Sequence, residues 1–425
     1  MDDPQPIDGG LRLIEGKLPR SLLLVTQLWG RDGGVAAHVR ASAALLARHG
    51  VDVHVLVAEV QPDRGAPEVA NVQPAEETPG VTVHRRPELL DARASIRARL
   101  GASLAAAPTV IHLHQRADAK LLDALRAHAP VVVSAHGYAA CTSGVYFFAP
   151  GQECTRAHGP GCVFNLTVRG CAHTHHLKPF PAKYREATRG VQTLARADLV
   201  LSYSSAVDRH LAANGLTRRA VIPLFATMDA KVGSGHATRR RVVFAGRVAG
   251  PKGPGVLLHA AREVEAEFVI CGEGRRLQAM RRLARQLGVE RRVDFKGWLA
   301  PDALAQELAD ASVVAMPSRW PEPFGLVGIE ALAAGRPVVA SATGGILDWL
   351  QDGVNGLSVR PGDARDLARA LDELLVDPER QRIMGEAGRA MVAARFSPER
   401  HLAALSESYR VARATWQLTP GAALR

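Results

Sequence analysis

The feature that most constrains the fold is an alternation of short apolar runs with amphipathic helical segments, which starts at Ser21. The runs are rich in Val, Leu and Ile, and such continuous runs are typical of parallel strands buried on both faces. In the first half we expect a helix at 35–48 and strands at 21–28, 51–58, 109–113, 131–135, 199–202 and 221–222. The pattern predicts a parallel sheet covered by helices on both faces.

The second half of the chain repeats this alternation. Its apolar runs predict strands at 241–245, 267–271, 293–296, 312–316 and 337–340. Its amphipathic segments predict helices near 255–263, 275–287, 302–310, 326–334, 364–375, 378–393 and 398–416. The chain therefore encodes a second α/β unit of the same kind.

These two units divide the chain into domains. Residues 231–239 are polar and contain Gly, which predicts an interdomain linker around 225–240. The predicted fold class is α/β, with two doubly wound Rossmann-like domains facing a cleft, and ligands of such sheets bind at the carboxyl ends of the strands. We expect a flexible N-terminus at 1–20, an N-terminal domain at 21–228, a C-terminal domain at 229–396, and a final helix at 397–425 that packs back on the N-terminal domain.

The net charge of +11 comes from 53 Lys and Arg against 42 Asp and Glu. Residues 1–225 contribute 25 − 19 = +6 and residues 226–425 contribute 28 − 23 = +5, so the charge is evenly spread. Proteins that bind nucleic acid concentrate basic residues on one face or arm, so we expect no nucleic-acid partner. Residues 1–20 lack the apolar run of a secretory signal, and no apolar stretch is long enough to span a membrane. We expect a cytoplasmic protein, either free or peripheral on the inner face of the cell membrane.

The most informative motif is SRWPEPFGLVGIEALAAGRPVVA at 318–340. Glu322 and Glu330 are separated by seven residues, with Pro-Phe-Gly between them and a predicted helix that begins near Leu326. A helix N-terminus offers unpaired amides and a positive dipole end to a phosphate. Carboxylates accept hydrogen bonds from neighbouring hydroxyls, so this block predicts a ligand that combines phosphate with hydroxyl groups.

Two glycine-containing loops point to the same chemistry. The segment VVFAGRVAGPKGPG at 242–255 places Gly246, Arg247 and Lys252 after a buried strand, and a guanidinium fork with an ammonium group suits a diphosphate. It lacks the GxxxxGK[ST] pattern of P-loop nucleotide triphosphatases. Gly33 and Gly34 follow the first predicted strand, where they are either a glycine loop that opens a helix toward a phosphate or a plain turn.

Together these blocks resemble the retaining glycosyltransferases of family 4, which have the GT-B fold. The resemblance is strong over 241–395 and looser over 21–225. It implies a retaining enzyme that moves a sugar from a UDP- or GDP-linked donor to a glycan, a lipid-linked or a small-molecule acceptor, in bacterial envelope or polysaccharide synthesis. No Asp-x-Asp metal motif is present, so we expect no cofactor for catalysis, with Arg247 and Lys252 replacing a divalent ion.

The resemblance also implies roles for single residues. Glu322 would contact the transferred sugar, Glu330 the ribose, and Arg247 and Lys252 the donor diphosphate. The catalytic set would be His136, Arg247, Lys252 and Glu322, with His136 lining the sugar site. The donor-binding set would be Gly33, Gly34, Gly246, Arg247, Lys252, Gly272, Glu273, Glu322, Phe324, Gly325, Leu326 and Glu330.

Two other functions fit parts of the pattern. One is a nucleotide-sugar epimerase of related fold, which would need no acceptor. The other is a non-catalytic protein that binds nucleotide sugars. The Glu322 and Glu330 block favours transfer over epimerisation, and the presence of Arg247 and Lys252 argues against a degenerate site. The base and sugar of the donor, the acceptor and the oligomeric state are not encoded in any motif that we recognise.

A long insertion at 137–190 interrupts the α/β alternation and contains four of the five cysteines. Disulfides are rare in the cytosol, so clustered thiols favour a structural zinc ion, which would order a loop that has no core. Two disulfides, or four reduced thiols without a metal, are the alternatives. The candidate zinc ligands are Cys141, Cys154, Cys162 and Cys171.

The same region is rich in basic and aromatic side chains, including Arg185, Arg189 and Arg196. Such a surface would bind acceptor sugars or rest on an anionic membrane. The alternative is an ordinary solvated helix face.

Overall fold

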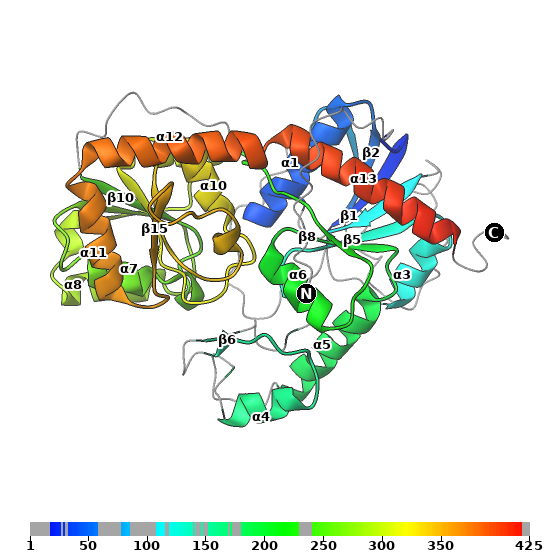
Figure 1. Cartoon of the computed structure of the whole chain (residues 1–425), viewed down its shortest axis with the longest axis horizontal. Helices are drawn as coiled ribbons and strands as arrows, with labels where there is room; N and C mark the ends of the chain where they lie inside the picture. Colours follow the sequence, from blue (N-terminus) through cyan, green and yellow to red (C-terminus); the bar gives the residue numbers. More distant parts are fainter. Residues whose placement is uncertain are drawn as a thin grey trace.

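The structure is a computed structural model of the 425-residue chain. It describes residues 18–26, 29, 33–57, 78–85, 108–114, 119–138, 141, 146–147, 152–168, 171, 180–228 and 240–418. Two parallel sheets, each covered by helices on both faces, lie side by side along the long axis of the molecule (Figure 1). The predicted α/β class and the two Rossmann-like domains are confirmed.

The N-terminal sheet has seven strands in the order β3-β2-β1-β4-β5-β8-β9, all parallel. The strands are β1 (Ser21–Thr26), β2 (Asp52–Val57), β3 (Val81–Arg85), β4 (Val110–Leu113), β5 (Val131–Ala135), β8 (Leu199–Ser202) and β9 (Arg219–Val221). Its helices are α1 (Gly34–Arg48), α3 (Ala119–Arg126), α5 (Phe180–Leu194) and α6 (Ser205–Ala213). Every residue of β1, β4, β5 and β8 is buried, as expected for strands covered on both faces.

The C-terminal sheet has six parallel strands in the order β12-β11-β10-β13-β14-β15. The strands are β10 (Arg241–Ala245), β11 (Glu267–Cys271), β12 (Val293–Gly297), β13 (Val313–Met316), β14 (Val338–Ser341) and β15 (Gly356–Val359). The helices are α7 (Pro254–Ala260), α8 (Leu277–Gln286), α9 (Pro301–Ala309), α10 (Leu326–Ala333), α11 (Ala364–Leu375) and α12 (Pro378–Arg395), with short 3₁₀ turns η2 (Gly250–Lys252), η3 (Glu290–Arg292) and η4 (Gly345–Asp348).

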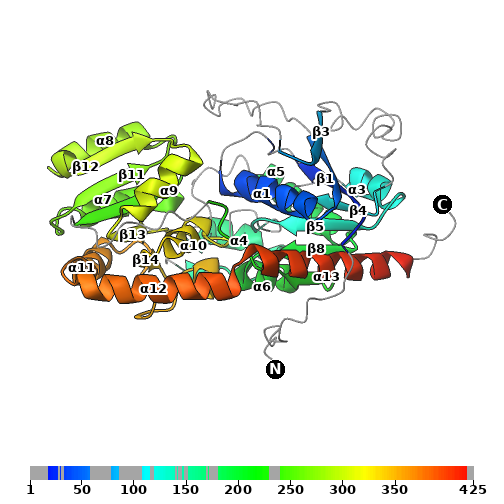
Figure 2. The same cartoon turned by 90° about the horizontal axis from the view of Figure 1, so that it is seen from above.

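The final helix, α13 (Pro398–Gln417), follows α12 after a short break. Pro398 cannot continue the preceding helix, and the Ser397 side chain accepts a hydrogen bond from the amide of Arg400 to start the next. Helix α12 packs on α10, whereas α13 crosses to the N-terminal domain and contacts α1, β5 and β8 (Figure 2). The indole of Trp416 donates to the carbonyl of Arg126 at 2.8 Å, which ties the end of α13 to α3.

The insertion contributes a small hairpin, β6 (Tyr146–Phe147) with β7 (Gln152–Glu153), and the helix α4 (Gly161–Val168) before α5. In Figure 1 this part projects beneath the region where the two domains meet. No described helix has the length and apolar character to cross a bilayer.

Two parallel strands were not predicted. Strand β3 follows the polar segment 61–80, whose residues 61–77 lie outside the described part, and strand β15 holds only the short run Gly356–Val359. Both are edge strands, whose side chains give a weaker apolar signal than central strands do. The predicted linker at 225–240 lies mostly outside the described residues, and the domain boundary at 228 and 229 stays a prediction.

Candidate active site

The carboxyl ends of the two sheets meet across the interface between the domains. Gly34 begins α1 after β1, and a Cβ built on it would lie 3.5 Å from the side chain of Leu326, the first residue of α10. Gly137 follows β5, and its Cβ would lie 3.8 Å from Pro323. Loops predicted to bind the donor from opposite halves of the sequence are therefore neighbours in space.

Glu322 is buried in the loop between β13 and α10, with only 2% of its surface exposed. Its carboxylate forms an ion pair with Lys252, whose Nζ lies 2.8 Å from Oε1 and 2.9 Å from Oε2. The hydroxyl of Ser318 donates to Oε1 at 2.6 Å, and the indole of Trp320 donates to the same atom at 3.3 Å. A buried carboxylate with this many donors is fixed in one orientation.

Lys252 ends the 3₁₀ turn η2, and Gly253 follows it with φ 72°. A Cβ on Gly253 would lie 1.8 Å from the carbonyl oxygen of Pro317, so only glycine fits there. This close approach holds the Lys252 loop against the segment that leads to Glu322. The two predicted donor motifs, 70 residues apart, are thus joined through backbone packing and an ion pair.

Glu330 lies in α10 and is also buried. The hydroxyl of Thr227 donates to its Oε1 at 2.8 Å, which connects α10 to the segment after β9 in the N-terminal domain. Burial raises the pKa of Glu330 to about 7, and the Thr227 hydrogen bonds offset only part of that effect. Glu330 can therefore gain or lose a proton near neutral pH.

The N-terminus of α10 faces the same region. Gly325 caps the helix with φ 87°, a left-handed conformation that favours glycine. The first turn of a helix leaves amides without intrahelical partners, and these are the groups expected to meet a phosphate. The Phe324 side chain, by contrast, is buried against Phe396, and its carbonyl accepts the Trp349 indole N–H at 2.8 Å.

The loops after β10, β11 and β12 are packed tightly against one another. A Cβ on Gly272 would lie 2.0 Å from the carbonyl oxygen of Gly246, so this glycine is required by the approach of the two loops. The carbonyl of Glu273 accepts from the amide of Val248 at 2.8 Å. Arg247 follows β10 at the carboxyl end of the C-terminal sheet, and its side chain is exposed and accessible to a ligand.

His136 directly follows β5, at the carboxyl end of the N-terminal sheet. Its Nε2 lies 3.1 Å from Nδ1 of His114, and its ring stacks on Tyr203 at 4.9 Å between centroids. Burial lowers its pKa to about 3, so the imidazole is neutral at physiological pH.

Behind His136 lies a histidine cluster that sequence reasoning missed, made of His38, His112, His114, His136 and His401. His112 bonds the hydroxyls of Tyr409 and Ser134 at 2.9 and 2.8 Å, and Ser42 bonds His401 at 3.2 Å. Burial lowers the pKa of every member of the cluster. The sequence does carry one signal, because His112 and His114 alternate at the carboxyl end of β4.

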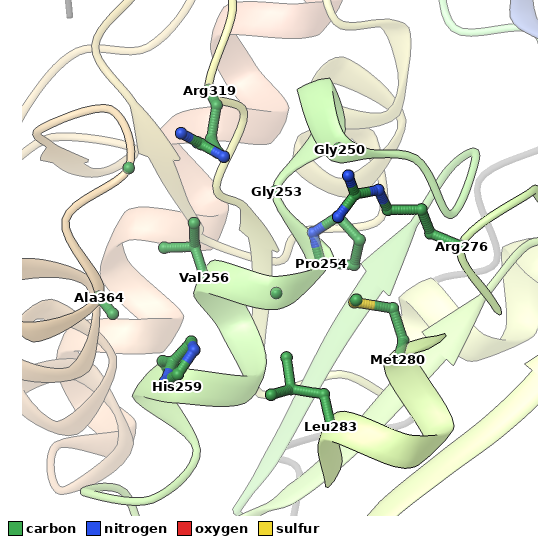
Figure 3. Close-up of a pocket in the computed structure, with 12 residues that line it drawn as sticks. Gly250, Gly253, Pro254, Val256, His259, Arg276, Met280, Leu283, Arg319 and Ala364 are labelled. Atoms are coloured by element: carbon green, nitrogen blue, oxygen red, sulfur yellow. The ribbon is translucent and has the colours of Figure 1, made fainter. Parts of the chain in front are cut away.

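One cavity, of 280 Å³, adjoins the candidate site without containing its carboxylates. It is lined by the start of α7, by Met280 and Leu283 of α8, and by two arginines. Figure 3 shows Arg319 above Val256 and Arg276 above Pro254, on two sides of the cavity. The cavity shares Gly250, Gly253, Pro254 and Gly255 with the loop that carries Lys252.

The described cysteines do not outline a metal centre. No disulfide joins them, and within the described residues no three His, Cys, Asp or Glu side chains are arranged to hold a metal ion. Cys154 does interact electrostatically with Cys141 and Cys162, which places these three thiols in one neighbourhood. All four proposed ligands lie in the described part of the chain without being arranged around a common point, and the zinc interpretation stays a prediction.

These features, two facing Rossmann-like domains with the predicted donor loops at their junction, define the GT-B class of glycosyltransferases. The profile of Glycosyltransferase Family 4 matches residues 32–226, and that of Glycosyl transferases group 1 matches residues 229–391. The D-inositol 3-phosphate glycosyltransferase of Corynebacterium aurimucosum is 30% identical over 381 residues, which span 84% of this chain and 86% of the relative. The chain therefore belongs to the family 4 type of GT-B glycosyltransferases, and it is a glycosyltransferase.

Solved structures agree on the fold. Anabaena HepE, determined with UDP and glucose, superposes with a TM-score of 0.68 at 20% identity, over 92% of this chain and 99% of its own. The sucrose-phosphate synthase of Thermosynechococcus elongatus superposes with a TM-score of 0.67 at 23% identity, over 92% and 98%. At these identities the likeness establishes the GT-B fold and nothing finer.

Proposed function

We propose that this glycosyltransferase transfers a sugar, with retention of anomeric configuration, from a UDP- or GDP-linked donor to a hydroxyl of a glycan, a lipid-linked or a small-molecule acceptor in bacterial envelope or polysaccharide synthesis. The observation that carries the proposal is the Lys252–Glu322 ion pair beside the N-terminus of α10. It joins a cation for phosphate with a carboxylate for sugar hydroxyls. The bound UDP and glucose of Anabaena HepE support a nucleotide-sugar donor.

The cations act on the leaving group. As the bond to the anomeric carbon breaks, negative charge grows on the diphosphate, and we propose that Lys252, Arg247 and the first amides of α10 stabilise it. In the structure Lys252 is held by Glu322, so an incoming diphosphate shares this ammonium group with the carboxylate. Glu322 then faces the sugar while it stays anchored by Ser318 and Trp320.

The carboxylate of Glu330 is proposed to hold the ribose. It lies in α10, the helix whose first turn is proposed to bind the phosphate, and adjacent ribose hydroxyls could donate to both of its oxygens. Neutral His136, on the opposite face, is proposed to hydrogen-bond a hydroxyl of the transferred sugar. Gly33 and Gly34 leave room for the diphosphate to approach the start of α1.

A thermal-shift screen against UDP, GDP, ADP and their sugars tests the donor. A ligand that binds only the folded state at 100 times its Kd stabilises it by about 2.7 kcal/mol, so the correct nucleotide raises the melting temperature by several degrees. Lys252→Ala should abolish that shift, whereas Glu263→Ala, at an exposed site after α7, should retain it. The absence of a shift with every nucleotide would refute the donor assignment.

The stereochemistry of transfer is tested separately. Transfer with an inverted anomeric centre, seen by NMR of the product, would refute retention.

We further propose a structural zinc ion held by Cys141, Cys154, Cys162 and Cys171. Such an ion would order the insertion and would take no part in transfer. Elemental analysis of purified protein should find one zinc per chain, lost on Cys154→Ser. Protein without stoichiometric zinc would remove this proposal.

A peripheral membrane role is proposed on the exposed arginines of α5. Arg185 and Arg189 are exposed on this helix, whereas Arg196 forms an ion pair with Asp123 and is partly neutralised. Binding to anionic liposomes at low salt, weakened at high salt, is expected in a flotation assay. Flotation with neutral liposomes alone, or no flotation at low salt, would contradict it.

A further inference from the structure

The insertion reaches across the interface through one side chain. Oε1 of Glu153, at the end of β7, accepts hydrogen bonds from the Thr343 hydroxyl at 2.6 Å and from the Gly344 amide at 2.7 Å. Thr343 and Gly344 follow β14 in the C-terminal domain. This contact is therefore an interdomain contact, made by a hairpin that the α/β alternation does not require.

The residues that Glu153 contacts lie directly on the Glu322 loop. Gly344 pairs with Glu322 in a parallel bridge, and the amide of Gly345 donates to the Glu322 carbonyl at 2.7 Å. A Cβ on Gly344 would lie 2.4 Å from that carbonyl oxygen, and one on Gly345 would lie 2.3 Å from the carbonyl oxygen of Pro323. This segment is thus packed directly against the backbone of Glu322 and hydrogen-bonded to it, so we expect a displacement of one to displace the other.

The other end of the segment is also held by the N-terminal domain. Oδ2 of Asp348 accepts from the Ser205 amide at 2.7 Å, and Oδ1 accepts from the Ser205 hydroxyl. Ser205 begins α6, so the negative charge of Asp348 meets the positive end of that helix. We call residues 343–348 the latch segment, because the N-terminal domain grips it at both ends while its middle supports Glu322.

We propose that Glu153 is a positioning residue which, through the latch segment, couples docking of the Cys-rich insertion to the orientation of Glu322 and its partner Lys252. Glu153 touches none of the proposed reacting groups, so it acts only through Thr343 and Gly344. The inference deepens the proposed function, because it assigns the insertion a part in assembling the donor site. It predicts that undocking of the hairpin loosens the Glu322 loop even when both domains remain folded.

The variant Glu153→Ala removes the one oxygen that accepts both hydrogen bonds, whereas Glu153→Gln keeps an amide oxygen for the same two donors, which are themselves uncharged. Glu153 is an exposed residue, so water competes for its two hydrogen bonds, and we expect the alanine variant to lower kcat/KM for the donor by about fivefold. The glutamine variant should recover most of that loss. Glu263→Ala is the matched control, as an exposed Glu outside the interface.

A second measurement does not depend on activity. Hydrogen exchange at the amides of Gly344 and Gly345 should accelerate about tenfold in Glu153→Ala and not in Glu153→Gln or Glu263→Ala. In the background Thr343→Val, which removes one donor to Glu153, the alanine substitution should lose part of its effect on kcat/KM, because contacting residues are non-additive.

Unchanged exchange of these amides in Glu153→Ala would overturn the proposal, and so would full additivity with Thr343→Val. If exchange responds as expected while the wild-type chain transfers no sugar from any nucleotide sugar, the proposed function fails and the coupling through the latch segment stands.

Discussion

The two faces of the interdomain junction differ in charge. The C-terminal face holds Lys252, Glu322, Arg247 and Glu330, whereas the N-terminal face holds neutral imidazoles and phenols around His136 and Tyr203. A departing diphosphate needs preorganised charge, but a sugar with neutral hydroxyls needs directional partners that carry none. The proposed chemistry therefore divides between the domains: the charged groups proposed to act on the diphosphate belong to the C-terminal domain, and the groups around His136 are neutral.

The two faces also respond to pH in opposite directions. Burial lowers the pKa of the clustered histidines, to about 3 for His112 and His136 and about 4 for His401. Burial raises the pKa of Glu330 to about 7. A fall in pH therefore lowers the stability contributed by the N-terminal face, and a rise in pH lowers the stability contributed by the C-terminal face.

The largest expected effect is acid destabilisation of the N-terminal domain. Unfolded histidines take up protons near pH 6.5 while the buried ones stay neutral, so stability falls as the pH drops from 6.5 toward 4. Each such histidine costs up to about 2 kcal/mol at pH 5. Hydrogen exchange at pH 7 and pH 5 should show β4 and β5 losing protection while β10 and β11 keep it. An equal loss of protection in both sheets would contradict the assignment of acid sensitivity to the N-terminal domain.

Loss of the donor-side cation comes next. Lys252→Ala should lower transfer by about 10²- to 10³-fold, as for removal of one group that stabilises a developing anion, and it leaves buried Glu322 without its ion pair. Lys296→Ala removes an exposed lysine of the same domain and serves as the control, with transfer unchanged. Steady-state kinetics with the nucleotide sugar found by the thermal-shift screen measure both. A Lys252 variant within twofold of wild type contradicts the charged-face assignment.

A smaller effect is expected at Glu330. Its raised pKa favours folding below pH 4.5, and that contribution is lost as the pH rises through 7, because the buried carboxylate then carries a charge. Glu330→Gln should therefore melt about 5 °C above wild type at pH 8 and within a degree or two of it at pH 5. The same variant should bind the nucleotide more weakly. A gain in melting temperature that is equal at both pH values would show that Glu330 is not the titrating group.

The smallest effect is expected for the Tyr203 hydroxyl, on the neutral N-terminal face. Tyr203→Phe removes the hydroxyl that bonds Ser134 at 2.6 Å but keeps the ring that stacks on His136. One buried hydrogen bond is worth about 1 kcal/mol, so the melting temperature should drop by about 2–4 °C. The donor KM should stay at its wild-type value. A change in donor KM would place Tyr203 in the donor site and blur the division between the faces.

The sequence predicted two kinds of feature: the repeated strands and helices, and motifs whose residues lie close together in the chain. Continuous apolar runs such as 242–245 located the buried strands, and the spacing of Glu322 and Glu330 located the loop and helix that carry them. The sequence did not reveal contacts between distant residues. His38 meets His401, and Glu153 meets Gly344, through a packing that depends on the complete fold. A lone histidine or glutamate has no pattern of its own, so such pairs become visible only in three dimensions.

The position of α13 has a consequence for how the chain is made. Tyr409, Ala412 and His401 are fully or almost fully buried against the N-terminal domain, although they come last in the sequence. A ribosome therefore releases the start of this domain long before its closing helix exists, and the C-terminal domain can fold in between. Of the two domains, the one synthesised earlier is completed later, so a nascent or truncated chain that ends before residue 397 leaves an apolar surface and His112 without their cover.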